Sequence, residues 1–381
     1  MARITMGLPV LTLMGPRQSG KTTLARTHFS HLPYVSLENP DQRRAVELDP
    51  RGFLAAHPEG AVIDEVQRVP QLLSYLQEVV DLRPHPGRWV LTGSHNLMLM
   101  ESVSQSLAGR SGLLTLLPFS LAELQALRPL SSTDQLLWQG GYPRIHTQGV
   151  DPLVHHRSYY QTFVERDLRS LLKIHDLSRF DTFVRLCAGR VGQLLNIASL
   201  ANDAAISPST AREWLGLLEA AYVLIRVPPW HANIGKRLVK SPKLYFIDVG
   251  LACYLLDIEE PGHLHNHPLR GNLFENLVII EALKNRLNRG LEGRLHFFRS
   301  ASGDEVDLLF PQGPALTPIE IKSGATMHTG WLNNIDKWRK ISGSKHGGLV
   351  IYNGDQVMPY HIDHGMGLQG FLGWLDKQGR A

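Results

Sequence analysis

One run of residues near the start of the chain has the types and spacing that suit phosphate binding. Gly15 to Thr22 match the pattern G-x-x-x-x-G-K-[ST], after the apolar run Val10 to Met14 and before residues typical of a helix start. Glycines let backbone N–H groups approach phosphate oxygens, and a helix N-terminus adds about half an elementary charge. The run predicts a nucleoside triphosphate site, with ATP as ligand, formed by Gly15, Pro16, Arg17, Gln18, Ser19, Gly20, Lys21, Thr22 and Thr23.

Within this run, two side chains have distinct expected roles. Lys21 would reach the β- and γ-phosphates, and the Thr22 hydroxyl would bind Mg²⁺. A second motif supports this prediction, because Ala61 to Glu65 form a short apolar run that ends in two acids. Asp64 would hold Mg²⁺ through water, and Glu65 would orient or deprotonate the attacking water. The alternative is an ordinary strand followed by a solvated acidic turn.

Two further positions are candidates for contact with the γ-phosphate. The predicted strand Trp89 to Ser94 ends in small polar residues, so Ser94 or Asn96 is a candidate sensor of that phosphate, with a plain turn as the alternative. Arg110 follows a glycine and is a candidate finger that stabilises charge in the site of a neighbouring subunit. A surface role for Arg110 is the alternative.

The middle of the chain combines helical patterns with a basic stretch. Residues 162–172 and 179–188 have helical spacing, and 194–203 and 209–221 are predicted to form a helix-turn-helix. Residues 223–227 and 243–248 would be the strands of a wing, with an acid-free loop between them. The loop and its edges carry the residues predicted to contact DNA phosphates, namely Arg226, Lys236, Arg237, Lys240 and Lys243. Protein contact by the same surface is the alternative.

Near the C-terminus, a predicted helix from Gly271 to Leu287 is followed by strands at 295–299, 305–310 and 317–322, a helix at 330–341 and a strand at 348–352. Asp307 and the run Glu320-Ile321-Lys322 lie on the second and third strands. This arrangement resembles the PD-(D/E)xK nuclease superfamily. The resemblance implies that Asp307 and Glu320 hold Mg²⁺, that Lys322 positions or deprotonates water, and that Glu275 supplies another acid.

One feature departs from that superfamily's motif. Val306 stands before Asp307, where the motif usually has proline. A form of the fold that binds without cleaving is therefore also consistent with the sequence. Elsewhere, three alternate histidines from His263 to His267 lie between prolines and are interpreted as a linker and not as a metal site.

Several ordered motifs resemble a known group. The chain is similar to prokaryotic AAA-type ATPases with a poorly characterised C-terminal half. The similar segments begin at Gly15, Val62, Leu91 and Glu101 and continue with Gly140 to Ile145, Tyr159 to Leu168 and Leu244 to Leu251. Such proteins usually have a helical segment before the P-loop strand, whereas here the strand begins close to Met1. Because of this departure, the sequence does not predict which residues contact the adenine base.

Composition limits the class of protein. The 381 residues are 43% hydrophobic and 19% charged, with 39 Lys and Arg against 35 Asp and Glu, which gives a net charge of +4 and permits anionic partners. Cys187 and Cys253 lie in apolar runs without metal-ligand spacing and are predicted to be free buried thiols in a cytoplasmic protein. No run is long enough to span a membrane.

These observations predict an α/β protein of three domains. They are a P-loop AAA-type domain with a doubly wound parallel sheet over 1–128, a helical and winged-helix domain over 129–260, and a restriction-endonuclease-like α/β domain over 261–381. The function expected is ATP hydrolysis coupled to action on DNA, in a homo-oligomer if Arg110 acts between subunits. The alternative is an ATP-switched interaction protein with a protein partner and a non-catalytic C-terminal half.

Overall fold

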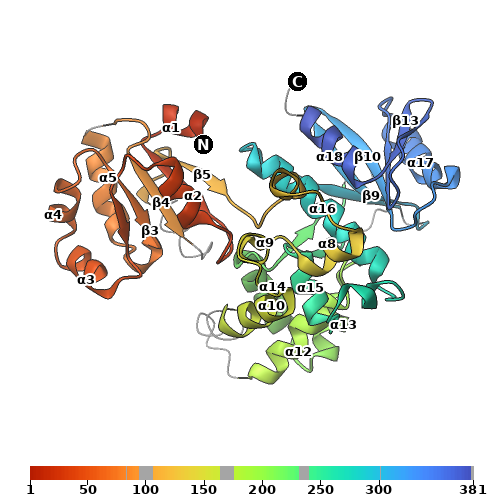
Figure 1. Cartoon of the computed structure of the whole chain (residues 1–381), viewed down its shortest axis with the longest axis horizontal. Helices are drawn as coiled ribbons and strands as arrows, with labels where there is room; N and C mark the ends of the chain where they lie inside the picture. The colour runs from red at the N-terminus through yellow and green to blue at the C-terminus, as the bar shows by residue number, and fades with distance from the viewer. Residues whose placement is uncertain (83, 94–105, 164–175, 231–239, 301, 379–381) are drawn as a thin grey trace. The chain divides into compact units, whose positions relative to one another are not determined.

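The computed structural model describes residues 1–82, 84–93, 106–163, 176–230, 240–300 and 302–378. They form two compact units, one of Met1–Pro118 with Ala220–Tyr222 and one of Phe119–Glu219 with Val223–Ala381. The colours of Figure 1 follow the chain through both units. The candidate sensors Ser94 and Asn96 and the predicted helix over 162–172, beyond residue 163, lie outside the described residues.

The first unit alternates strands and helices. Its strands are β1 (Val10–Met14), β2 (Tyr34–Ser36), β3 (Ala61–Asp64), β4 (Trp89–Gly93) and β5 (Ser111–Thr115). Its helices are α1 (Ala2–Gly7), α2 (Lys21–His28), α3 (Pro40–Leu48), α4 (Pro50–Ala55), the 3₁₀ turn η1 (Val66–Arg68) and α5 (Leu72–Leu82). The short helix α1 comes before β1, where the sequence had suggested little more than the strand itself.

All strand pairs in this unit are parallel, in the order β2-β3-β4-β1-β5. Alternate residues of the strands enter two different hydrophobic clusters. Ile63 and Leu91 pack with α4 and α5, whereas Val62 and Val90 pack with Ala25 of α2. Helices therefore cover both faces of the sheet, and the predicted α/β fold with a doubly wound parallel sheet is confirmed.

The second unit begins with helices and a two-stranded sheet. The helices are α7 (Leu121–Leu127), α8 (Thr133–Gln139), α9 (Pro143–Thr147), α10 (Pro152–Tyr159), α12 (Leu177–Ala188), α13 (Ile197–Asp203), α14 (Pro208–Ala220), α15 (Val249–Leu255) and the turn η3 (Pro261–Leu264). Strands β6 (Leu224–Val227) and β7 (Lys243–Phe246) pair in antiparallel register. The predicted linker at His263 to His267 is in part the η3 turn.

The predicted helix-turn-helix segment contains two helices followed by this hairpin. Helix α13 begins at Ile197, three residues later than predicted, because the Asn196 side chain accepts a hydrogen bond from the Ser199 N–H and caps the helix there. Leu194, which was expected to be helical, instead forms a β-bridge with Lys243. Figure 1 shows α12, α13 and α14 grouped in this part of the second unit.

The C-terminal part is a mixed sheet with helices. The elements are α16 (Arg270–Asn288), β8 (His296–Arg299), β9 (Glu305–Gln312), β10 (Ala315–Lys322), η4 (Thr329–Leu332), α17 (Asn333–Ser342), β11 (Leu349–Tyr352), β12 (Met358–Tyr360), β13 (Asp363–Met366) and α18 (Leu368–Lys377). The strand order is β12-β13-β11-β10-β9-β8, with β10, β11 and β13 parallel to one another. The predicted order of helix, three strands, helix and strand is present, and β12, β13 and α18 extend it.

The two cysteines, Cys187 and Cys253, are buried and free, as predicted, and burial raises the pKa of both thiols. Among the helices that the structure describes, none combines the length and apolar character needed to cross a membrane.

Candidate functional site

The P-loop joins β1 to α2 and is shaped by two glycines with positive φ. Gly20 has φ of 96° and caps α2, whose first residue is Lys21. Gly15 has φ of 143°, and a Cβ on it would lie 2.0 Å from the carbonyl oxygen of Leu116. Gly20 needs to be glycine because of its positive backbone angle, and Gly15 needs to be glycine because the Leu116 backbone lies so close to it. Gly15 therefore fixes the loop against the Leu116 backbone, and Gly20 provides the turn into α2.

Lys21 is buried inside this loop. Its Nζ donates to the carbonyl oxygens of Gly15, at 2.9 Å, and Pro16, at 2.7 Å. Burial lowers the pKa of Lys21 to about 8, against the opposing effect of Glu65 and Asp64. The ammonium group is thus positioned by the loop itself, in a place where it is poorly solvated and suited to anionic phosphate oxygens.

The other predicted ligand-binding residues of the loop differ in exposure. Ser19 is buried, and its hydroxyl has no hydrogen-bond partner among the described residues. Arg17 is half-buried, while Gln18 and Thr23 are exposed. Gln18 has φ of 61°, which is uncommon for a residue other than glycine.

Asp64 lies at the carboxyl end of β3 and accepts hydrogen bonds from three neighbouring elements. The Thr22 hydroxyl of α2 lies 3.2 Å from Oδ1 and 3.1 Å from Oδ2, and the Tyr34 hydroxyl of β2 lies 2.7 Å from Oδ2. The Thr92 hydroxyl of β4 also donates to Oδ1. The structure thus brings together the predicted pair Thr22 and Asp64, which would hold Mg²⁺.

Tyr34 and Thr92 were missed by the sequence reasoning. Each lies on a strand that neighbours β3 in the sheet, and each places a hydroxyl on the Asp64 carboxylate. Burial, followed by the hydrogen bond to Asp64, raises the pKa of Tyr34 to about 12, so this hydroxyl stays a donor at neutral pH. The only local signal was a polar side chain inside an apolar run.

Glu65 follows Asp64 with a left-handed backbone, φ 56° and ψ 46°. The Gln67 side-chain amide donates to its carboxylate, and the Glu65 N–H donates to the Thr92 hydroxyl at 3.4 Å. The acid predicted to orient water is therefore held at its backbone and at its side chain, next to Asp64.

Arg110 pairs with Asp81 through two parallel contacts, Nε to Oδ1 at 2.5 Å and Nη2 to Oδ2 at 2.8 Å. About a third of the Arg110 side chain is exposed. Within its own unit this residue is thus part of a surface ion pair. Its action on a neighbouring subunit stays a prediction.

In the second unit, the charged residues predicted from the C-terminal motif come together. We call Glu275, Glu305, Asp307 and Glu320, with Lys243 and Lys322, the carboxylate site. Lys322 Nζ lies 2.6 Å from Glu320 Oε2 and 3.2 Å from Asp307 Oδ2. The Ile321 N–H also donates to Asp307, at 2.8 Å. Glu320 and Lys322 thus lie on the same side of β10, as their spacing predicts.

The four carboxyl groups of this site are not equivalent. Burial, with Asp307 as the next cause, raises the pKa of Glu320 to about 8, and burial raises the pKa of Glu275 to about 7. Burial would also raise the pKa of Asp307, but Lys322 and Lys243 outweigh it and hold that pKa below its usual value. Of Glu275, Asp307 and Glu320, Asp307 is therefore the carboxylate that stays charged most readily.

Lys243 was predicted to contact DNA, and the structure corrects this prediction. Its side chain is 3% exposed and makes ion pairs with Glu275 at 2.9 Å and Glu305 at 2.5 Å. A third carboxylate, of Asp307, lies 3.7 Å from it. The residue is buried because these acids come from α16 and β9, distant in sequence from β7, so Lys243 belongs to the carboxylate site and not to a basic surface.

The remaining predicted DNA contacts have different surroundings. Arg226 pairs with Glu219, and about a third of its side chain is exposed. Lys240 is exposed, whereas Lys236 and Arg237 lie outside the described residues. Within the described parts of the chain, no group of three or more His, Cys, Asp or Glu residues is arranged to hold a metal ion. Asp307 and Glu320 are only two acids, but two carboxylates are enough protein ligands for Mg²⁺, because this ion keeps several bound waters.

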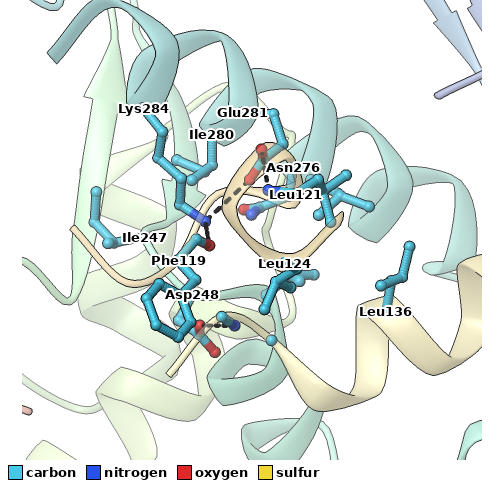
Figure 2. Close-up of a pocket in the computed structure, with 14 residues that line it drawn as sticks. Phe119, Leu121, Leu124, Leu136, Ile247, Asp248, Asn276, Ile280, Glu281 and Lys284 are labelled. Atoms are coloured by element: carbon cyan, nitrogen blue, oxygen red, sulfur yellow. Dashed lines mark hydrogen bonds and ion pairs between the residues drawn. The ribbon is translucent and has the colours of Figure 1, made fainter. Parts of the chain in front are cut away.

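The motifs at Gly140 to Ile145 and Leu244 to Leu251 meet in a buried polar clamp, which we define as Phe119, Gly141, Asp248, Glu281 and Lys284 (Figure 2). Asp248 accepts from the N–H groups of Gly141, at 2.7 Å, and Leu251, at 3.0 Å. Lys284 Nζ donates to the Phe119 carbonyl at 2.8 Å and to Glu281 at 3.0 Å.

The clamp surrounds a cavity of about 10 Å³, which is room for about one water molecule. A Cβ on Gly140, whose φ is 65°, would lie 2.2 Å from Asp248 Oδ1. These two motifs are therefore explained by packing and by hydrogen bonds within the second unit, without a ligand.

Three family models match successive parts of the chain. Residues 8–125 match the family model described as an AAA domain. Residues 130–262 and 270–368 match two models that are each described as a domain of unknown function.

Two uncharacterized proteins, of Mycobacterium tuberculosis and Mycobacterium bovis, are each 33% identical to this chain over 321 residues, which is 84% of this chain and 71% of theirs.

Two solved structures have more distant similarity. The Walker-type ATPase of Pyrococcus abyssi is 16% identical with a TM-score of 0.47, and the match covers 67% of this chain and 93% of that one. A RuvB variant of Thermotoga maritima is 23% identical with a TM-score of 0.29, over 58% of this chain and 82% of that one. Neither likeness is close enough to support a shared function. The chain belongs to the same family as the two mycobacterial proteins, and its residues 8–125 are an AAA-type P-loop ATPase domain.

Proposed function

We propose that this protein hydrolyses ATP and couples hydrolysis to action on DNA. The observation that carries the ATPase part is the convergence of Thr22, Tyr34 and Thr92 on the Asp64 carboxylate beside the buried Lys21. Lys21 neutralises phosphate charge, Thr22 and Asp64 would hold Mg²⁺, and Glu65 orients water for attack. The AAA domain match over residues 8–125 supports this assignment.

The DNA part rests on the second unit. Helices α13 and α14 followed by the β6 and β7 hairpin have the element order of a winged helix, which commonly places a helix and a wing on a duplex. Lys240 is exposed beside this hairpin. Lys236 and Arg237, which are described by sequence alone, add two basic residues to the same loop. Together these residues favour contact with phosphates.

Substitutions can distinguish DNA binding by this loop from a general effect of the protein's positive charge. Changing Lys236, Arg237 and Lys240 to Glu should weaken duplex binding and reduce its dependence on salt concentration, because phosphate contacts release counterions. Changing Arg157, Lys345 and Lys377 together to Glu is the matched control, since these three exposed basic residues of the second unit lie outside the loop. Equal binding by the loop variant and the control would remove the loop from the DNA interface.

The carboxylate site is our candidate for metal-dependent cleavage of DNA. Asp307 and Glu320 would hold Mg²⁺, which on binding would polarise a phosphodiester. Lys322, in contact with both acids, would position water and stabilise charge on the phosphate. Glu275 lies on the other side of Lys243 and would help to hold the site's charge balance.

Cleavage can be tested directly. The full chain is incubated with linear, circular and branched DNA in Mg²⁺ or Mn²⁺, beside Asp307→Ala and Lys322→Ala. Cleavage that both variants lose supports the proposal. Cleavage that both variants retain, or its absence with every substrate and metal, rejects a nuclease role.

The structure also favours a second candidate function. Lys322 is paired with both Asp307 and Glu320, and a lysine so placed can neutralise the acids without any metal. The second unit would then bind a protein partner, and ATP would act as a switch. DNA-stimulated ATP hydrolysis separates the two functions, because a switch that acts on proteins alone has no reason to respond to DNA.

The role of Arg110 in a homo-oligomer can be tested by substitution. If it acts as a finger toward a neighbouring subunit, Arg110→Ala should lower the ATPase rate by about a thousandfold. Asp81→Ala, which removes its present partner, should leave the rate intact. A rate unchanged in Arg110→Ala would assign Arg110 to the surface ion pair alone.

A further inference from the structure

The carboxylate site contains one positively charged side chain, that of Lys243, beyond the residues of the predicted motif. Lys243 enters from β7, in the hairpin of the middle segment, whereas the acids lie on α16, β9 and β10. Its Nζ lies 2.9 Å from Glu275 Oε1, 2.5 Å from Glu305 Oε1 and 3.7 Å from Asp307 Oδ1. One ammonium group therefore serves three carboxylates.

Several contacts hold Lys243 and its partners in place. The Tyr245 hydroxyl, two residues further along β7, donates to the same Glu275 oxygen at 2.5 Å. The ammonium lies 5.6 Å from the centre of the Phe297 ring. Arg299 pairs with the other oxygen of Glu305 at 2.6 Å. Because the lysine side chain is 3% exposed, these acids take the place of water around its ammonium group.

One carboxylate oxygen of the site is left without a hydrogen-bond donor. Glu320 is 1% exposed, and its Oε2 accepts from Lys322 at 2.6 Å. The Asn334 side chain also lies close enough to stabilise the charged carboxylate, but Glu320 Oε1 makes no hydrogen bond to a described residue. A buried carboxylate oxygen without a donor is costly and is best satisfied by a metal ion or water. Asp307 shares Lys322 with Glu320.

We propose that Lys243 is a fixed internal counter-ion of the carboxylate site, so that the site takes one divalent cation, at Glu320 and Asp307, and excludes a second from the side of Glu275 and Glu305. The proposal rests on the metal site in the proposed function and adds its stoichiometry. Lys243 is a positioning residue, since it acts through the carboxylates. It also links the β6 and β7 hairpin to the site.

The test is a titration of the nucleotide-free full chain with Mn²⁺ at pH 7, with free Mn²⁺ counted by electron paramagnetic resonance. The wild type should bind one Mn²⁺ that Glu320→Gln loses, so any Mn²⁺ at the P-loop cancels in the comparison. Lys243→Met, which keeps the chain length and removes the charge, should bind Mn²⁺ about tenfold more tightly or take a second ion. Lys243→Arg should behave as the wild type.

Lys243→Met leaves buried acids unpaired, and this variant could fail to fold. A second pair of variants tests the same role if it does. Lys243→Met with Glu275→Gln removes both charges of one of the lysine's ion pairs and should still bind Mn²⁺ about tenfold more tightly than Glu275→Gln alone. Circular dichroism and thermal melting establish that each variant is folded.

The outcomes separate the two proposals. Equal Mn²⁺ binding with and without Lys243 in folded variants overturns the counter-ion role and leaves the metal site standing. Two Mn²⁺ ions lost together in Glu320→Gln also overturn it. No loss in Glu320→Gln overturns the metal site and the inference together.

Discussion

The Thr22 hydroxyl lies 3.2 and 3.1 Å from the two oxygens of Asp64, so the first residue pair expected to share Mg²⁺ is in direct contact across α2 and β3. The contact places a hydroxyl and a carboxylate, both oxygen ligands, on one spot at the carboxyl edge of the sheet. Lys21, the residue before Thr22, reaches back to the loop carbonyls on the same side.

Tyr34 should matter for hydrolysis although no motif contains it. Tyr34→Phe removes a 2.7 Å hydrogen bond that orients Asp64, and such a bond to a charged group contributes about 1.5–3 kcal/mol. We expect a fall of about tenfold or more in kcat/KM for Mg·ATP, with folding intact. Tyr75→Phe is the matched control in the same unit, because its ring lies under Arg51, away from Asp64. Equal activity of the two variants would remove Tyr34 from the site.

The affinity for ATP should fall as the pH rises past 8. The pKa of Lys21 is lowered to about 8, chiefly by burial, so the free protein loses the ammonium charge between pH 7 and 9. Binding then requires proton uptake, which lowers the affinity by up to about tenfold per pH unit above the pKa. Calorimetry in buffers of different ionisation enthalpy measures that proton. Lys21→Met should bind weakly with no such dependence, and a flat affinity from pH 7 to 9 in the wild type would contradict the assignment.

Asp248 should be needed for stability and not for catalysis. It caps α15 and accepts the buried N–H of Gly141, so Asp248→Ala loses a cap and leaves a buried donor unpaired. We expect a loss of about 2–4 kcal/mol in the free energy of unfolding, measured by denaturant titration. Asp248→Asn keeps an acceptor and should lose less. Glu260→Ala, at an exposed ion pair, should change little. A stable Asp248→Ala variant would show that the clamp contributes little.

Acid should destabilise the second unit through His155. Burial, with His156 as the next cause, lowers the pKa of His155 to about 4. The folded state therefore binds fewer protons than the unfolded state below the ordinary histidine pKa of about 6.5, so stability is complete above that pH and is lost as the pH falls toward 4. His155→Phe should flatten the fall in melting temperature over this range. An unchanged slope would assign the acid sensitivity to other groups.

The sequence predicted elements that carry strong local patterns. Strands β1, β3 and β4 are continuous apolar runs, and the P-loop marks the start of α2, so their positions followed from the residues alone. The edge strand β5 was missed because most of its residues, Ser111 to Thr115, are only half-buried and show no apolar run. Of the two other short strands that were missed, β12 is likewise not buried, whereas β13 is mostly buried but has the sequence Asp-His-Gly-Met, which shows no apolar run.

The parts of the sites that were missed depend on long-range neighbours. Tyr34 and Thr92 reach Asp64 because β2 and β4 flank β3, which spacing along the chain does not reveal. Lys243 was predicted to be on the surface because basic residues surround it in sequence. Only the fold shows that Glu275, Glu305 and Asp307 enclose it.

We propose that ATP hydrolysis by the P-loop domain responds to DNA bound by the second unit. The most direct measurement is the steady-state ATPase rate of the full chain with and without duplex DNA, beside Lys21→Ala and the triple Glu variant of Lys236, Arg237 and Lys240. We predict stimulation by DNA in the wild type, none in the triple variant, and no hydrolysis in Lys21→Ala. A wild-type rate that DNA leaves unchanged, in a protein that hydrolyses ATP, would contradict coupling between the P-loop domain and DNA.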